Sequence, residues 1–318
     1  MRTKNPMPKN NNLHQKTIDW ALKSLESSGY KLKSKLPENI LNTPWSYIIR
    51  FEASDGLIYL KQTPELISLE AEIINILADK FNIRVPEIIA HNAQLNCFLM
   101  KDAGRSLREI LKQKFDINLF CKAINNFTSM QLATADNVND FIDIGVPDWR
   151  LDKLPDLYMQ LLAQKDMLIA DGLLESELIE LKKLLPKVSS LCKKLSDYKI
   201  KQSIVQPDFN DNNTLIADQS EDITIIDLGE IAISHPFFSL INCLYQAKKH
   251  HAVTNKDDDY IKLEDACLNN YMIFGSKKYL LEALEIARIL CFIYGALGSY
   301  RLQVACDKSK FTSSFQRH

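Results

Sequence analysis

The chain has 318 residues, of which 46% are hydrophobic and 25% are charged, and its formal net charge is −1. This length is long for one hydrophobic core and fits two packed parts, while the near-neutral charge argues against a nucleic-acid partner and an anionic membrane surface. The sequence contains no run of about 18 consecutive apolar residues, so no membrane-spanning helix is expected.

The cysteines and the N-terminal residues bear on the compartment expected for the protein. Seven cysteines are spread along the sequence without a C-x-x-C pair. This pattern predicts a reduced, cytoplasmic protein rather than a disulfide framework or a zinc site. Residues 1–12 are basic and rich in Asn and Pro, and no apolar segment of the kind found in a secretory signal follows them. We expect a disordered leader there.

The first third of the chain predicts mixed α and β structure. Apolar residues recur at helical spacing in two segments, and runs of β-branched and aromatic residues flank Asp55-Gly56, a pattern typical of a β-hairpin. The expected elements are helices over 13–28 and 65–81, a hairpin of 45–51 and 57–61, and a strand pair of 87–91 and 97–101. A short connector over 101–104 follows them.

From Ala103 onward the pattern is mainly helical. Helices are expected over 106–114, 118–133, 152–171 and 176–194 and from 237 to the end, with a β-rich island over 203–227. The sequence therefore predicts an α+β protein with two lobes. Residues 13–102 would form a small β-rich N-lobe, and residues 103–318 a large helical C-lobe.

The β-rich island carries the residues with the clearest chemistry. Asp208 stands five positions before Asn213 in a loop, and a second strand over 223–226 ends on Asp227. This order of loop, strand, turn, strand and Asp is typical of a site that combines one base with two ligands for Mg²⁺, which prefers oxygen donors. The alternative is a set of polar turn residues between short strands. The strand that ends on Asp227 favours the site.

Several segments resemble the signatures of one family. Three of them lie in the second half of the chain: residues 205–213 resemble H-G-D-L-H-x-x-N, residues 225–227 resemble I-D-[WFL], and residues 232–240 resemble the run x-H-P-F-x-S-L. Two lie earlier: residues 43–61 resemble an opening P-W-S…G-x-V-x-x-K, and residues 98–108 resemble the hinge between the two lobes. These are signatures of the aminoglycoside phosphotransferase and choline kinase-like family, in a branch with a P-W-S opening. The resemblance implies a protein-kinase-like fold with a nucleotide-binding N-lobe and a catalytic, substrate-binding C-lobe.

The same resemblance implies roles for residues of the C-lobe. Asp208 would be the catalytic base that acts on the acceptor hydroxyl. Asn213 and Asp227 would hold Mg²⁺.

It also implies a nucleotide site in the N-lobe. Lys61 would contact the α- and β-phosphates and pair with Glu70, for which Glu72 is a rival in the same helical turn. The backbone from Met100 to Asp102 would hydrogen-bond the adenine.

The chain departs from the family pattern near these residues. Gln206 and Asn210 stand where the signature has His, and Pro207 stands where it has Gly. Glutamine cannot take a proton as histidine can, so the loop must be held differently. Residues 42–46, where the phosphates would be covered, contain no glycine, and Glu230 stands where a second Asp is common. None of these changes removes the base or a metal ligand.

Two polar runs have plain alternatives. His250-His251 ends a helix and has no third ligand nearby in sequence, so no metal site is expected there. Residues 257–259 are all Asp, which either attract a cationic substrate or cap the helix that follows.

The function expected from the resemblance is transfer of a γ-phosphate from ATP or GTP, with Mg²⁺, to a hydroxyl of a small molecule such as an aminoglycoside, an amino-alcohol or a sugar. The alternative is a degenerate pseudokinase that binds nucleotide or acts as a scaffold. A protein kinase is disfavoured because no A-P-E-like element follows Asp227 before Pro236. The sequence does not specify the acceptor, the nucleotide or the oligomeric state.

Overall fold

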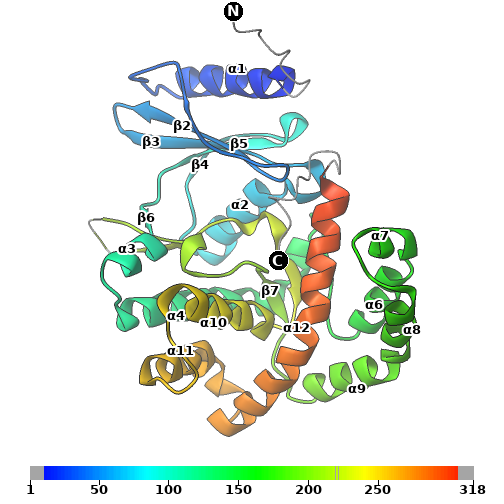
Figure 1. Ribbon diagram of the computed structural model, residues 1–318. Helices are drawn as coiled ribbons and strands as arrows, with labels where there is room; N and C mark the ends of the chain where they lie inside the picture. The colour runs from blue at the N-terminus through cyan, green and yellow to red at the C-terminus, as the bar shows by residue number, and fades with distance from the viewer. Residues whose placement is uncertain (1–10, 219, 221, 307–318) are drawn as a thin grey trace, which may run out of the picture. The chain divides into compact units, whose positions relative to one another are not determined.

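The structure is a computed structural model that describes residues 11–306 except 219 and 221 (Figure 1). The leader predicted over 1–12 lies outside the described residues up to residue 10, and helix α1 begins at Asn11. The described chain divides into two compact units. The smaller unit contains 11–74, 86–103 and 302–306, and the larger contains 75–85 and 104–301.

The smaller unit is built on a five-stranded antiparallel sheet with the strand order β1-β2-β3-β5-β4. Its elements are α1 (Asn11–Ser27), β1 (Glu38–Asn42), β2 (Tyr47–Ala53), β3 (Gly56–Gln62), the start of α2 (Glu70–Phe81), β4 (Ile88–Asn92) and β5 (Cys97–Lys101). Helix α1 lies along one face of the sheet (Figure 1), where Ala21 and Leu25 pack against Phe51 and Leu60. The predicted hairpin and strand pair are confirmed, and β1 is an additional strand.

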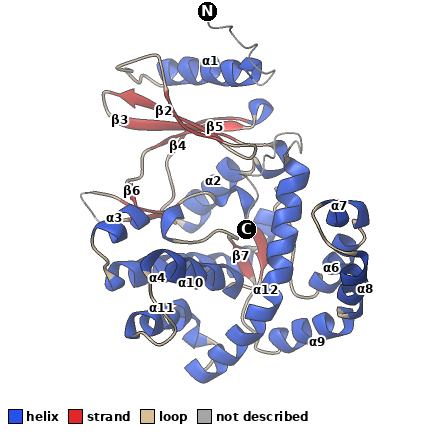
Figure 2. Ribbon diagram, viewed as in Figure 1, coloured by secondary structure: helices blue, strands red, loops and turns tan. Residues whose placement is uncertain are grey.

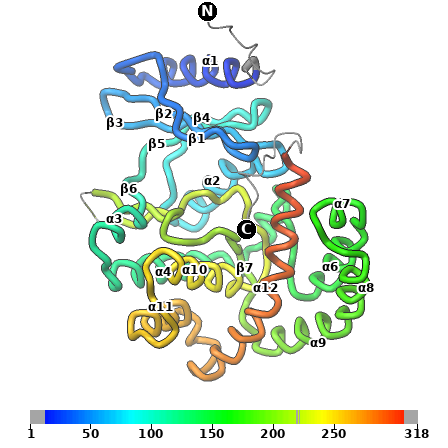
Figure 3. The backbone as a smooth tube through the Cα atoms, viewed as in Figure 1, coloured from blue at the N-terminus to red at the C-terminus, as the bar shows by residue number. Residues whose placement is uncertain are grey.

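The larger unit is mainly helical (Figure 2). Its helices are α3 (Leu107–Gln113), α4 (Ile117–Thr134), α5 (Asn139–Ile142), α6 (Leu154–Leu162), α7 (Lys165–Ala170), α8 (Glu175–Lys183), α9 (Leu185–Ser196), α10 (Phe237–His251), α11 (Asp258–Asn269) and α12 (Lys277–Ala305), of which the last turn belongs to the smaller unit. Helices α6, α8 and α9 pack on one another as a group (Figure 3). The predicted fold class, a small antiparallel sheet unit with a large helical part, is confirmed.

Short strands inside the larger unit position the loop of residues 206–213, which carries Asp208 and Asn213. They are β6 (Arg105–Ser106), β7 (Ser203–Val205), β8 (Thr214–Ile216), β9 (Ile223–Ile225) and β10 (Ala232–Ser234). Strand β8 pairs with β6 and β9, and β7 pairs with β10. Gly104 precedes β6 with φ +118°, and a Cβ there would lie 2.1 Å from the carbonyl oxygen of Ile216. Only glycine allows this close approach of the two backbones.

Three predicted helices differ from those in the structure. The helix predicted over 152–171 is interrupted at Ala163 and Gln164, between α6 and α7. The helix predicted over 176–194 divides at Leu184, because Pro186 lies in the first turn of α9 and lacks the N–H that a continuous helix would need. The helix predicted from residue 65 begins only at Glu70, after a 3₁₀ turn over Glu65–Ile67. In the described part of the chain, no helix is both long and apolar enough to cross a membrane.

Candidate active site

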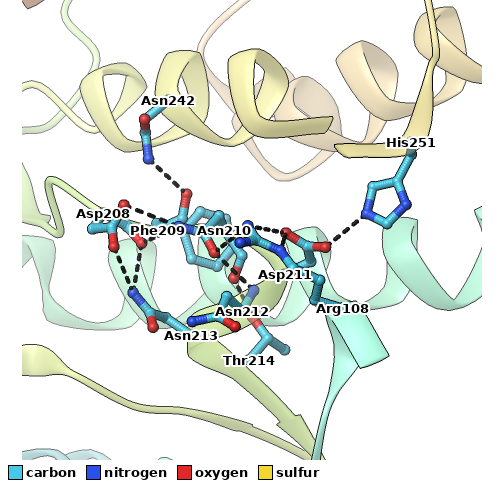
Figure 4. A network of polar contacts seen from close by, with 10 residues as sticks. All are labelled: Arg108, Asp208, Phe209, Asn210, Asp211, Asn212, Asn213, Thr214, Asn242 and His251. Atoms are coloured by element: carbon cyan, nitrogen blue, oxygen red, sulfur yellow. Dashed lines mark hydrogen bonds and ion pairs between the residues drawn. The ribbon is translucent and has the colours of Figure 1, made fainter. Parts of the chain in front are cut away.

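The loop between β7 and β8 brings Asp208 and Asn213 into direct contact (Figure 4). Asn213 donates from Nδ2 to the main-chain oxygen of Asp208 at 2.9 Å and to its Oδ2 at 3.1 Å. Asn210 donates from Nδ2 to the same main-chain oxygen at 2.8 Å and to Oδ1 at 3.0 Å. Both carboxylate oxygens of Asp208 thus accept an amide hydrogen bond, which fixes the orientation of the carboxylate.

An aromatic stack and a side-chain amide anchor the same loop. The ring of Phe209 stacks on Phe127 of α4 with 3.7 Å between the ring centroids. On the other side, Asn242 of α10 donates from Nδ2 to the main-chain oxygen of Phe209 at 3.3 Å. The residue next to Asp208 is therefore held between two helices of the larger unit.

Asp227 follows β9 in a left-handed conformation, with φ 64° and ψ 48°. This region is uncommon for a residue other than glycine, although Asp is one of the residues enriched there. The backbone nitrogen of Ile226 donates to the main-chain oxygen of Asn213 at 3.0 Å. The structure therefore joins the two predicted metal ligands through adjacent backbone.

Gln206 shows how the loop is held without the histidine of the family signature. Its Nε2 donates to the main-chain oxygens of Ile226 at 2.8 Å and Asp227 at 3.0 Å. The hydroxyl of Ser239 accepts from the backbone nitrogen of Gln206 at 2.8 Å and donates to its main-chain oxygen at 2.9 Å. The glutamine thus links the loop that carries Asp208 to the backbone at Ile226 and Asp227.

Asp211, three positions after Asp208, forms a buried network that the sequence does not predict. Its carboxylate is fully buried and contacts Arg108 of α3 at 2.7 Å and His251 of α10 at 2.7 Å. Burial alone would raise the pKa of Asp211, but hydrogen bonds from His251 and Arg108 outweigh it and hold the pKa below its ordinary value. These three residues are far apart in sequence, so no motif connects them.

In the smaller unit, Lys61 and Glu70 form a buried ion pair. Lys61 Nζ lies 2.5 Å from Glu70 Oε2, and the side chains are only 5% and 2% exposed. Lys61 is on the central strand β3, opposite Ile48 of β2 and Phe98 of β5. Glu72, the rival partner, lies instead 3.6 Å from His91.

The predicted adenine-binding backbone is partly occupied by the sheet. The backbone nitrogen of Lys101 donates to Glu87, and that of Asp102 donates to Leu57 at 3.0 Å. Met100 lies in register with Tyr59 of β3. A nucleotide contact at Asp102 would therefore use its main-chain oxygen or its side chain rather than its N–H.

The glycine-free segment is a closed turn between β1 and β2. The backbone nitrogen and the hydroxyl of Thr43 donate to the main-chain oxygen of Ser46 at 2.9 and 3.1 Å, and the backbone nitrogen of Ser46 donates to the hydroxyl of Thr43 at 3.0 Å. Trp45 packs against the cluster of Ile67 and Leu302. Hydrogen bonds and packing thus shape this turn without glycine.

The side-chain oxygens of Asn213 and Asp227 suit a hard cation that also binds ligands from outside the protein. Asn213 and Asp227 offer amide and carboxylate oxygens, and Mg²⁺ is commonly held by one or two such groups together with water and phosphate oxygens. Among residues 11–306 other than 219 and 221, no three His, Cys, Asp or Glu side chains gather as a self-contained metal site.

No known family model and no curated protein sequence matches this chain. Solved structures do match it. The ethanolamine kinase Pv091845 of Plasmodium vivax has a TM-score of 0.59 and 16% identity, covering 86% of this chain and 83% of that chain. The choline/ethanolamine kinase family protein of Mesorhizobium loti has a TM-score of 0.56 and 16% identity, covering 91% and 87%. The amicoumacin kinase hAmiN has a TM-score of 0.55 and 13% identity, covering 95% and 91%.

At these identities the comparison concerns the fold, and it agrees with the fold that the motifs of residues 43–240 predict. The chain has the fold of the choline and ethanolamine kinases and of the amicoumacin kinase hAmiN.

Proposed function

We propose that the protein is a kinase that transfers the γ-phosphate of ATP or GTP to a hydroxyl group of a small molecule. The observation that carries the proposal is the joined set of Asp208, Asn213 and Asp227, held together by amide and backbone hydrogen bonds. The kinase fold supports it, because hAmiN was solved in complex with AMP-PNP, Ca²⁺ and Ami. The proposed acceptors are amino-alcohols, aminoglycosides and sugar-like compounds.

Asp208 is the proposed base. Its carboxylate, oriented by Asn210 and Asn213, would accept the proton of the acceptor hydroxyl as that oxygen attacks the γ-phosphorus. Asn213 and Asp227 would hold Mg²⁺, which supplies positive charge to the phosphate oxygens. Because hydrogen bonds within the loop orient the side chains of Asp208 and Asn213 before substrate arrives, these two groups would need little reorganisation during the reaction.

Lys61 is the proposed phosphate ligand in the smaller unit. Glu70 fixes its ammonium group, and a buried pair of this kind is a weak contributor to stability. A role in binding phosphate explains why the chain keeps the pair. Met100 and Asp102 would contact the nucleotide base.

The test is a nucleotide-consumption screen of the purified protein with ATP and GTP, each with Mg²⁺, against choline, ethanolamine, aminoglycosides and simple sugars. We expect at least one acceptor to stimulate consumption and to be recovered as a phosphate ester. Asp208→Asn should lose this activity and retain nucleotide binding. If the wild type binds Mg²⁺-nucleotide but phosphorylates no acceptor, the pseudokinase interpretation replaces the kinase. Failure to bind either nucleotide would overturn both.

A further inference from the structure

Asp211 is a charged group inside the protein for which the proposed reaction has no direct use. Its side chain has no exposed surface, and its two oxygens are occupied from opposite sides (Figure 4). Arg108 donates to Oδ1 from Nε at 3.1 Å and from Nη2 at 2.7 Å, while His251 Nε2 lies 2.7 Å from Oδ2. An ionised carboxylate only accepts hydrogen bonds, so the Nε2 atom of His251 carries the proton.

The network continues from Asp211 to the proposed base. Arg108 also donates from Nη2 to Oδ1 of Asn210 at 3.1 Å. Asn210 in turn donates from Nδ2 to Oδ1 of Asp208 at 3.0 Å. Its own Oδ1 also accepts a hydrogen bond from the backbone nitrogen of Asn212 at 2.7 Å. The guanidinium group of Arg108 and the backbone N–H of Asn212 thus both orient the Asn210 amide, and that amide contacts the carboxylate of Asp208.

We propose that Arg108 and His251 are positioning residues that clamp Asp211 and Asn210 and thereby fix the carboxylate of Asp208. The proposal rests on the proposed function, in which Asp208 is the base. Neither residue is expected to touch the substrate or the nucleotide. They act on the reaction through the loop alone.

The two ends of this clamp are attached to rigid parts of the larger unit. Arg108 lies in the first turn of α3, just after β6, and β6 pairs with β8, the strand that leaves the catalytic loop. His251 ends α10, and its ring lies 5.4 Å from Phe115 and 5.8 Å from Phe120 between ring centroids. Packing therefore limits the rotation of the imidazole, so that its N–H stays directed at Asp211.

Helix α10 reaches the loop at three places along its length. Ser239 bonds both backbone groups of Gln206, Asn242 bonds the main-chain oxygen of Phe209, and His251 bonds Asp211. The first two contacts hold backbone, and only the third acts on a side chain that is coupled to Asp208. The clamp is therefore expected to control the rate of reaction more than the folding of the loop.

The test uses variants that remove or restore one donor. His251→Phe keeps the packing between two aromatic rings and removes the N–H, whereas His251→Gln places an amide nitrogen near the position of Nε2. Arg108→Leu removes the guanidinium, and Arg105→Leu is the matched control because Arg105 forms an exposed ion pair with Asp218. Misplacement of a catalytic group through a supporting residue typically costs about 10–100-fold.

We expect His251→Phe and Arg108→Leu to lower kcat by about 10–100-fold, with the KM for nucleotide within about threefold of the wild type. His251→Gln should recover most of the rate, and Arg105→Leu should behave as wild type. In hydrogen exchange, the two clamp variants should speed the exchange of amides in residues 206–214 and leave α4 unchanged. A purely structural role would instead speed exchange throughout the larger unit.

Hydrogen exchange needs no acceptor, so it separates failure of the clamp from failure of the proposed function. If the wild type transfers no phosphate, faster exchange confined to residues 206–214 in His251→Phe still supports the clamp. Unchanged exchange and unchanged kcat in that variant overturn it. If Arg108→Leu does not fold, Arg108→Lys, which keeps the charge and loses the paired N–H donors, is measured in its place, and wild-type exchange in Arg108→Lys also counts against the clamp.

Discussion

Replacing Glu70 by leucine should destabilise the smaller unit by about 3–5 kcal/mol, because it removes the carboxylate 2.5 Å from a lysine ammonium that is itself only 5% exposed. Replacing both partners, as Lys61→Met with Glu70→Leu, removes both charges and should lie within about 1 kcal/mol of the wild type. The double variant should nevertheless lose nucleotide binding. The free energy of unfolding of the double variant would then return to near the wild-type value, whereas its nucleotide binding would not.

The measurement is urea denaturation followed by tryptophan fluorescence. The chain has three tryptophans, and in a Trp149→Phe background the remaining Trp20 and Trp45 both report on the smaller unit. Lys33→Met is the surface control, since the ion pair of Lys33 with Glu52 has side chains more than half exposed and should contribute less than about 1 kcal/mol. Equal destabilisation of the single and double variants would refute the reasoning, because it would mean that packing rather than charge sets the cost.

Three further predictions follow from single residues. Asp208→Asn should lower kcat by about 10²–10⁴-fold without weakening Mg²⁺-nucleotide binding, measured by steady-state rates and calorimetry; an unchanged rate would mean that the base is another residue. Burial lowers the pKa of His235 from 6.5 to about 3, so between these values the unfolded chain binds a proton that the folded chain does not. Stability should therefore fall by about 2 kcal/mol from pH 6.5 to pH 5 in urea titrations, and His235→Asn should lose this dependence. Gly104→Ala should destabilise by more than about 1 kcal/mol, since the new Cβ meets the main-chain oxygen of Ile216; a wild-type melting temperature would contradict the backbone approach.

Local sequence patterns predicted the elements that depend on local interactions. The hairpin around Asp55-Gly56 and the strand that ends before Asp227 both appear, because turn residues and β-branched runs act within a few positions. The sequence also predicted that Asp208, Asn213 and Asp227 belong to one loop and two adjacent short strands. These are the parts of the site in which sequence neighbours are also spatial neighbours.

Other features depend on contacts between distant residues, and no local pattern contains them. Strand β1 is exposed along its whole length and β10 has only three residues, so neither shows the alternation that identifies a strand. The contact of Asp211 with Arg108 spans 103 positions and that with His251 spans 40. The sequence predicts no metal site at His250-His251, and the contact of His251 with Asp211 appears only in the folded chain.

Each unit contains costly features at residues proposed to act in phosphoryl transfer or to position those that do. Asp227 adopts a backbone conformation that disfavours side chains, Asp211 is an ionised group without exposed surface, and Lys61 and Glu70 are buried charges. A protein selected only for stability would gain by replacing each of them with a well-packed apolar residue or with glycine. Each cost is offset locally, by Gln206 at Asp227 and by Arg108 and His251 at Asp211. Buried charges that are each held by local partners suit the preorganised site that the proposed kinase reaction requires.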